Sequence, residues 1–241
     1  MVLVRQAPRR FFDVSFMVTR QCDLECPFCM YDSSPRIHDR LDPSLARSFI
    51  ASLALERINS FGFYGGEPAV ALKEFGEVAL MLPKGAPRFV ITNGAWSKGK
   101  AKTEEFLGWA LLHQMHVYVS STAYHQRFQD RERLEELAEE HDWVTLKPGE
   151  RKGDFIPMGK LAHLKVNCTQ MCVKHERPTR LAVQPDGSVL FQNCDGRYPI
   201  VGQAEEGFRV LRERVETMYE KGFMSVCPFF KPEAFAQGMA S

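Results

Sequence analysis

Three cysteines lie close together near the start of the sequence, and their spacing is suited to binding a metal or an iron–sulfur cluster. Three residues separate Cys22 from Cys26, and two separate Cys26 from Cys29. An all-cysteine 4Fe-4S cluster or a tetrahedral zinc site takes four protein ligands, so this loop is one short. The loop therefore predicts either an iron with an open position, where a small molecule can bind, or a zinc ion completed by another side chain such as His38.

The remaining four cysteines lie in the last third of the chain. They are Cys168, Cys172, Cys194 and Cys227. The total of seven is odd, so they cannot all be paired within one chain, and clustered cysteines in a reducing compartment usually serve metal binding or catalysis. Four thiolates match one fully ligated 4Fe-4S cluster or one zinc ion, and partly buried structural cysteines are the third interpretation.

The overall charge and hydropathy exclude several classes of protein. The 241 residues carry a net charge of +1, which excludes the overall basic field that binds polymeric nucleic acid non-specifically. No run approaches the roughly 20 apolar residues of a membrane span, and residues 1–10 lack the apolar core of a secretory signal. We therefore expect a soluble, cytoplasmic protein with no membrane partner.

Strand and helix patterns alternate along the first two thirds of the chain, which is typical of βαβ units in a parallel sheet. Asp42 before Pro43 predicts the start of the first helix, and Thr103 predicts the start of the third. The five expected strands cover residues 12–18, 61–64, 89–91, 117–120 and 143–146. With a sixth strand expected at 155–158, the predicted fold is α/β, a partial barrel of five or six parallel strands.

The character of the sequence changes after about residue 160. Two short strand patterns flank Pro185-Asp186-Gly187, which is a good hairpin turn, and a helix is expected over 204–221 with Gly222 as its C-cap. We therefore predict two domains, a partial barrel over 1–160 and a small domain over 161–241 that holds the last four cysteines.

Each of the first four expected strands ends in residues that suit a ligand site. The cysteine loop follows the first strand, Gly65-Gly66-Glu67-Pro68 follows the second, Asn93 follows the third, and Ser120 is the last residue of the fourth. The carboxyl ends of the strands are where parallel α/β barrels place their active sites. Glycine lets the backbone approach a ligand closely, and a glutamate can accept a hydrogen bond from an ammonium group.

These motifs, in this order, resemble the radical S-adenosylmethionine (radical SAM) superfamily. Residues 22–29, Cys-Asp-Leu-Glu-Cys-Pro-Phe-Cys, resemble its signature loop, and residues 65–68 resemble its Gly-Gly-Glu-Pro motif. The resemblance implies that the three cysteines hold a 4Fe-4S cluster whose remaining iron binds S-adenosylmethionine (SAM). It also implies the positions that contact SAM: Phe28 near the adenine, Gly65, Gly66 and Glu67 at the methionine end, and Asn93 and Ser120 as polar contacts.

The later part of the chain resembles the auxiliary-cluster domains called SPASM and, in shorter form, twitch. The resemblance rests on residues 181–194, which contain the Pro185-Asp186-Gly187 turn and Cys194, and on 200–202 before the last helix. It implies a second 4Fe-4S cluster held by the last four cysteines, although the spacing of Cys168 and Cys172 is unusual for such a domain. Zinc, or no metal, are the alternatives for this set.

Several other polar or charged residues could contribute to a ligand site. Thr122 stands where many relatives carry aspartate, and His125 is expected to be structural or to start a helix. Lys147 forms a basic patch with Arg151 and Lys152, which is interpreted as a solvated loop or otherwise as a site for an anionic group. The charged stretch 130–140 is interpreted as a solvated helix face.

The resemblance implies a radical SAM enzyme of oxidoreductase or isomerase type. Its 5′-deoxyadenosyl radical would abstract hydrogen from a small-molecule, nucleotide or peptide substrate, leading to oxidation, cross-linking or rearrangement. An electron donor such as flavodoxin or ferredoxin would reduce the cluster, and no catalytic side chain is predicted. The alternative from another class is a zinc-binding, cysteine-rich interaction module without catalysis.

Overall fold

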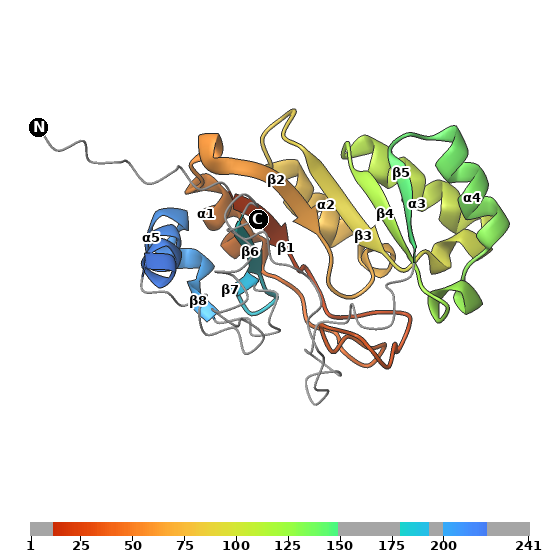
Figure 1. The fold of residues 1–241 in the computed structure, drawn as a ribbon, viewed down its shortest axis with the longest axis horizontal. Coiled ribbons are helices and arrows are strands. Elements are labelled where there is room, and N and C mark those ends of the chain that lie inside the picture. Colours follow the sequence, from red (N-terminus) through yellow and green to blue (C-terminus); the bar gives the residue numbers. More distant parts are fainter. Residues whose placement is uncertain (1–11, 149–178, 193–199, 221–241) are drawn as a thin grey trace, which may run out of the picture.

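The computed structural model describes residues 12–148, 179–192 and 200–220 (Figure 1). Within these ranges, eight strands form one open sheet in the order β5-β4-β3-β2-β1-β6-β7-β8. β1 to β6 run parallel, and β7 and β8 are antiparallel additions. The strands are β1 Phe12–Phe16, β2 Ile58–Phe63, β3 Arg88–Thr92, β4 His116–Ser121, β5 Val144–Pro148, β6 Thr179–Val183, β7 Ser188–Gln192 and β8 Ile200–Gln203.

Helices connect the successive strands from β1 to β5. Because these strands are also neighbours in the sheet, right-handed crossovers place the connecting helices on one face, and Figure 1 shows α2 and α3 behind the strands. The capping residues explain two of the helix starts: Asp42 accepts a hydrogen bond from the backbone N–H of Ser44 (2.8 Å), and Asp130 accepts one from that of Arg133 (3.2 Å). The helices are α1 Pro43–Ala51, α2 Leu72–Met81, α3 Lys100–Leu112, α4 Arg131–Glu140 and α5 Phe208–Glu220.

The core joins the first strand to the last helix. Phe12 and Phe16 of β1 are fully buried, and Phe12 meets Phe208 of α5 edge-to-face with 5.2 Å between ring centroids. Phe49 of α1 contacts both Phe16 and Phe208 (6.4 Å each). The buried aromatic rings therefore hold β1 rigidly, and β1 ends where the cysteine loop begins.

The predicted partial barrel is confirmed, but its sixth parallel strand is not the one expected from the sequence. β6 lies beside β1 with Val14 opposite Leu181, so the first arm of the predicted hairpin completes the parallel set. The expected strand at 155–158 lies outside the described residues. The hairpin turn is as predicted, with Gly187 at a φ of 79° and Asp186 accepting from the backbone N–H of Ser188 (3.0 Å). The division into domains 1–160 and 161–241 stays a prediction.

Two predicted helix boundaries are wrong. α3 begins at Lys100, and Thr103 lies inside its first turn, where its hydroxyl donates to the carbonyl of Gly99 (3.0 Å) and so does not cap the helix. The helix expected over 204–221 is divided, because Gly207 adopts a φ of 80° between a short 3-10 helix, η6 (Ala204–Glu206), and α5. The expected C-cap at Gly222 lies outside the described residues.

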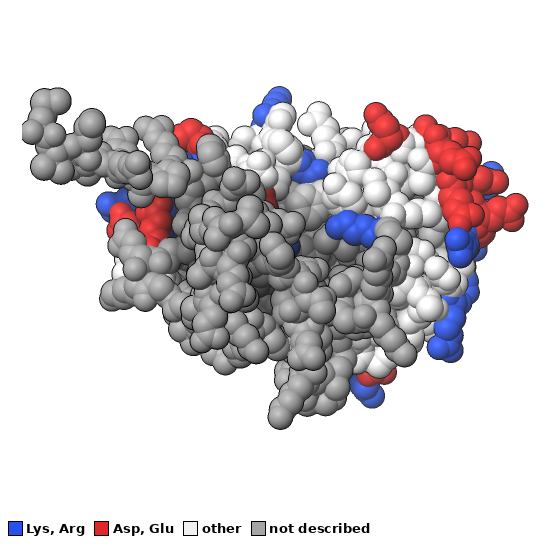
Figure 2. Space-filling model, viewed as in Figure 1, with Lys and Arg blue, Asp and Glu red and all other residues white. Residues whose placement is uncertain are grey.

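The surface of α4 is acidic, as predicted for a solvated helix face. Figure 2 shows acidic side chains gathered on this helix at one end of the molecule, where Glu132, Glu135, Glu136 and Glu139 lie. In the described part of the chain, none of the helices combines the length and hydropathy needed to span a bilayer.

Candidate functional site

A cavity of about 320 Å³ lies beside the loop that follows β1, and it is lined by residues at the carboxyl ends of all five of the strands β1 to β5. The aromatic and glycine-rich parts of its wall come from the loops after β1 and β2, and most of its aliphatic hydroxyl groups come from β3, β4 and the segment after β4. Every predicted site residue that the structure describes contributes to the lining. These are Cys22, Cys26, Phe28, Cys29, Gly65, Gly66, Glu67, Asn93 and Ser120. Residues from separate segments of the sequence therefore lie together at this edge of the sheet, and their role as a site stays a prediction.

Each of the three cysteine sulfurs faces a nitrogen that can donate a hydrogen bond. Sulfur that is bound to a metal is a thiolate and only accepts, so donors around it stabilise the metal-bound form. The backbone N–H of Leu24 donates to Sγ of Cys22 (3.4 Å), and that of Ser33 donates to Sγ of Cys29 (3.3 Å). Nε2 of His125 lies 3.5 Å from Sγ of Cys26. The three cysteines are free of disulfides.

The buried thiol of Cys22 is not ionised without a metal. Burial raises the pKa of Cys22 well above its ordinary value, and the nearby carboxylates of Glu67 and Asp23 raise that pKa further. A metal that binds here has to displace the proton, and its positive charge then offsets the desolvation of the thiolate.

The arrangement of the thiols fits one face of a cluster. Among the residues that the structure describes, no three His, Cys, Asp or Glu side chains converge on a point that could hold a single metal ion, and His38 does not join the cysteines. In a 4Fe-4S cluster the thiolates bind different irons, so holding one does not require the thiols to converge on a single point. Cys22, Cys26 and Cys29 line one cavity, and they would leave one iron of such a cluster without a thiolate from the described residues.

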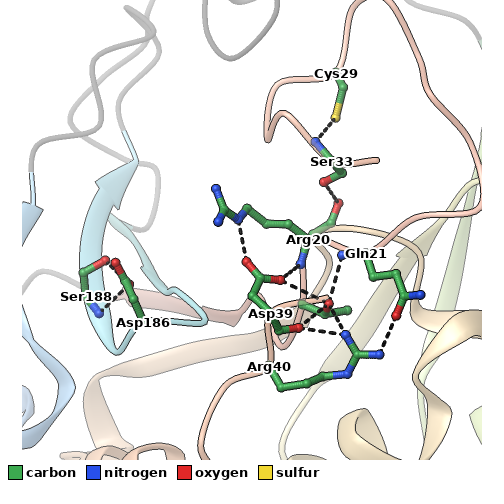
Figure 3. Close-up of polar contacts among 10 residues, drawn as sticks. Arg20, Gln21, Cys29, Ser33, Asp39, Arg40, Asp186 and Ser188 are labelled. Atoms are coloured by element: carbon green, nitrogen blue, oxygen red, sulfur yellow. Dashed lines mark hydrogen bonds and ion pairs between the residues drawn. The ribbon is translucent and has the colours of Figure 1, made fainter. Parts of the chain in front are cut away.

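A polar clamp closes the base of the cysteine loop (Figure 3). The carboxylate of Asp39 accepts from both the backbone N–H (2.7 Å) and Nε (2.6 Å) of Arg20. The hydroxyl of Thr19 donates to the backbone carbonyl of Asp39 (2.7 Å), and Arg40 donates to that hydroxyl (2.7 Å) and to the side-chain oxygen of Gln21. The two ends of the loop are thereby joined, which restrains the segment that carries the three cysteines.

We expect Asp39→Ala to lower the free energy of unfolding by about 1 kcal/mol, because it removes the carboxylate that accepts from two donors of the exposed Arg20. Urea denaturation of the metal-free protein measures this effect. Glu25→Ala is the matched control, since it breaks an exposed ion pair with Arg36 in the same loop and is expected to change stability by under about 0.5 kcal/mol. Equal effects of the two substitutions would show that the clamp does not stabilise the loop.

The glycine turn after β2 lies directly against the exit of β1. The backbone N–H of Gly66 donates to the carbonyl of Thr19 (2.8 Å), and that of Glu67 donates to the carbonyl of Gln21 (2.8 Å). A Cβ at Gly66 would lie 1.7 Å from the oxygen of Gln21, and Gly65 adopts a φ of 140°. Glycine is therefore required at both positions, by close approach at the second and by backbone conformation at the first.

Glu67 connects the turn after β2 to the end of β3. Its carboxylate accepts from the hydroxyl of Thr92 (2.6 Å) and from the backbone N–H groups of Asn93 (2.7 Å) and Ala69 (3.1 Å). The side chain is 1% exposed, and burial, aided by the charge of Asp23, raises the pKa of Glu67 to about 7. A bound cation would lower that pKa again, so this wall of the cavity favours a positively charged ligand group.

The cavity is also lined by residues outside the predicted set of SAM contacts. Tyr31, two residues after the third cysteine, stacks on Tyr64 with 5.2 Å between ring centroids, and both line the wall. Lys147, interpreted from the sequence as part of a solvated loop, lies in β5 at the cavity with Nζ 4.2 Å from the ring centroid of Tyr118. His125, expected to be structural, is 8% exposed and also lines the cavity. The position of Tyr31, an aromatic residue two places after Cys29, was the feature of the sequence from which its place in the cavity could have been predicted.

The later cysteines belong to the part of the chain that the structure does not describe. Cys168, Cys172, Cys194 and Cys227 all lie outside the described residues, as do Arg151 and Lys152. The auxiliary cluster and its ligands therefore stay a prediction.

Comparison with known proteins supports the assignment of the fold. No protein-family model matches the chain. The "Putative peptide biosynthesis protein YydG" of Bacillus subtilis (strain 168) is 26% identical over 118 residues, which cover 48% of this chain and 37% of that protein. The matched region thus spans little more than a third of the curated relative.

Two solved structures were found to be similar, with different TM-scores. The crystal structure of BtrN in complex with AdoMet (SAM) and 2-DOIA has a TM-score of 0.60 at 16% identity, covering 91% of this chain and 87% of BtrN. The structure of histidine-tagged anSMEcpe with bound AdoMet has a TM-score of 0.48 at 16% identity, covering 84% and 80% of the two chains. The chain thus has the fold of BtrN, which agrees with the resemblance of its sequence motifs to the radical SAM superfamily.

Proposed function

We propose that this chain is a radical SAM enzyme that binds a 4Fe-4S cluster through Cys22, Cys26 and Cys29 and binds SAM in the adjoining cavity. The observation that carries the proposal is that all nine described site residues, from the carboxyl ends of four different strands, line that one cavity. When bound, the cluster and SAM would supply a 5′-deoxyadenosyl radical, formed by one-electron cleavage of the sulfonium, that abstracts hydrogen from the substrate.

The chain's own residues bind and orient SAM in this proposal. Glu67 offers a buried anionic acceptor to the ammonium of the methionine end, while Gly65 and Gly66 let the backbone approach it. Phe28 provides an aromatic face for the adenine, and it is fixed by an edge-to-face contact with Tyr124 (5.6 Å). Cys22 and Cys26 are each at most 9% exposed, so the loop also excludes water from the reacting groups.

The substrate class we propose is a small molecule, a nucleotide or a peptide, and the reaction is an oxidation, cross-link or rearrangement. A cavity of about 320 Å³ is in the range of small-ligand sites, roughly 300–1,000 Å³. The name of YydG favours a peptide, whereas the complex of BtrN with 2-DOIA favours a small molecule. The proposal includes an auxiliary cluster in the later domain, an electron donor such as flavodoxin or ferredoxin, and a cytoplasmic location.

The test is anaerobic reconstitution with iron and sulfide, followed by metal analysis and incubation with SAM and dithionite. We expect about eight irons per chain if both cysteine sets hold 4Fe-4S clusters, about four if only the first does, and release of 5′-deoxyadenosine in either case. Chromatography with mass spectrometry detects the nucleoside. Zinc without iron, and SAM left intact, would overturn the proposal in favour of the zinc-binding module.

A further inference from the structure

The segment that follows β4 lies against the cysteine loop, although about a hundred residues separate them in the sequence. The hydroxyl of Tyr124 donates to the backbone carbonyl of Glu25 (3.1 Å). His125, the first residue of the short 3-10 helix η4 (His125–Phe128), meets Phe28 edge-to-face with 5.7 Å between ring centroids. Three residues of the loop, Glu25, Cys26 and Phe28, thus contact this segment and fix the plane of the imidazole.

The two nitrogens of His125 have different neighbours. Nε2 lies 3.5 Å from Sγ of Cys26, and Nδ1 lies 2.9 Å from the hydroxyl of Thr122. The same hydroxyl accepts from the backbone N–H of His125 (3.4 Å), and its own hydrogen can donate to Nδ1. The ring proton then lies on Nε2 and faces the sulfur, and this is the tautomer that an iron-bound thiolate, which only accepts, requires.

We infer that His125, oriented by Thr122, donates a hydrogen bond to the cluster-binding sulfur of Cys26 and thereby raises the reduction potential of the SAM-binding cluster. The inference rests on the proposed function. Reduction adds one electron to the cluster and so increases the negative charge shared with its thiolates, and a donor on a ligand sulfur stabilises the more negative state. No bond forms or breaks, and the electron comes from a low-potential reductant.

His125 is therefore expected to change the reduction potential of the cluster and not its binding. The three thiolates that hold the cluster are unchanged when the imidazole is replaced, and Phe at this position keeps an aromatic ring against Phe28. Loss of a single hydrogen bond to a charged sulfur changes the equilibrium constant of reduction roughly tenfold, which for one electron is about 59 mV.

The experiment is a redox titration of the reconstituted protein followed by electron paramagnetic resonance. We expect His125→Phe to lower the cluster potential by about 59 mV with iron content unchanged. His125→Gln should restore most of the potential, because its amide nitrogen can reach the position of Nε2. Thr122→Val should lower the potential less than His125→Phe does, and Thr122→Ser, which keeps the hydroxyl, should match the wild type.

A second measurement needs no cluster. Long-range proton–nitrogen correlation spectra of the ¹⁵N-labelled metal-free protein, with the His125 signals assigned by His125→Phe, should show Nε2 protonated, and Thr122→Val should weaken that preference. An unchanged cluster potential in His125→Phe, or a His125 ring protonated only on Nδ1, would overturn this inference but not the proposed function. A wild-type protein that binds no cluster would overturn the proposed function itself. If His125→Phe loses iron, the potential of Thr122→Val decides: a lowered value supports the inference, and a wild-type value contradicts it.

Discussion

Cys26→Ala is expected to abolish release of 5′-deoxyadenosine from SAM and to lower the iron content by about four atoms per chain. Cys26 lies between the other two thiols in the loop, and its sulfur lines the cavity together with theirs. With Cys22 and Cys29 alone, two irons of the cluster would have no protein ligand, and a cluster held at two corners is lost to solvent. Iron analysis and the anaerobic SAM assay together measure the effect.

The control for this substitution is Glu25→Ala at the neighbouring position. The side chain of Glu25 is exposed and forms an ion pair with Arg36, and the backbone carbonyl that receives the hydroxyl of Tyr124 is kept. We expect this variant to retain both iron and SAM cleavage. Full iron and full activity in Cys26→Ala would contradict the assignment of the loop as the site of the SAM-binding cluster.

The remaining iron in Cys26→Ala also reports on the later cysteines. About four irons per chain would remain if the second set holds its own 4Fe-4S cluster, and almost none if it does not. The same sample therefore separates the prediction for the described site from the prediction for Cys168, Cys172, Cys194 and Cys227.

The sequence allowed prediction of the site where its members follow consecutive strands. Alternating apolar patterns indicate β1 to β5, and parallel strands joined in order bring their carboxyl ends to one edge. The cysteines, the Gly-Gly-Glu turn and Asn93 each follow a different strand, and Ser120 lies at the end of a fourth, so their convergence required only the order of the strands. Local signals and a general rule of topology were sufficient for these residues.

Contacts between distant segments were not predictable in this way. The pairing of β6 with β1 depends on a register of Val14 against Leu181, for which periodicity contains no signal. The same holds for the contact of His125 with Cys26, which are 99 residues apart. A histidine after a strand is compatible with many environments, and only the docking of η4 on the cysteine loop distinguishes them.

The predicted helix boundaries were wrong at positions where glycine or threonine can adopt more than one role in the local backbone structure. Thr103 is a good N-cap by type, yet Gly99 precedes the helix and Thr103 bonds back to it. Gly207 takes a positive φ that ends one helical segment and begins another, whereas the apolar spacing across it is continuous. Propensity alone does not decide between these alternatives, because packing of Phe208 against β1 selects the start of α5.

Gly66→Ala tests whether the turn after β2 is held against the cysteine loop as tightly as the structure indicates. The added methyl would lie 1.7 Å from the carbonyl oxygen of Gln21, and it would have to move to at least 3.0 Å. The atoms it meets are backbone, so the turn itself must shift, which breaks the hydrogen bonds from Gly66 to Thr19 and from Glu67 to Gln21. Overpacking and the two lost hydrogen bonds together are expected to lower the free energy of unfolding by about 3–5 kcal/mol.

Urea denaturation of the metal-free protein measures this loss, with Gly108→Ala as the matched control. Gly108 lies within α3 and has no atom within 4 Å of a new Cβ, so alanine there should raise the free energy of unfolding by roughly 0.5–1 kcal/mol. The two glycine-to-alanine variants are thus expected to change stability in opposite directions. A Gly66→Ala protein as stable as the wild type would show that the turn has room to move, and Glu67 would then not be held in the position that we propose for binding SAM.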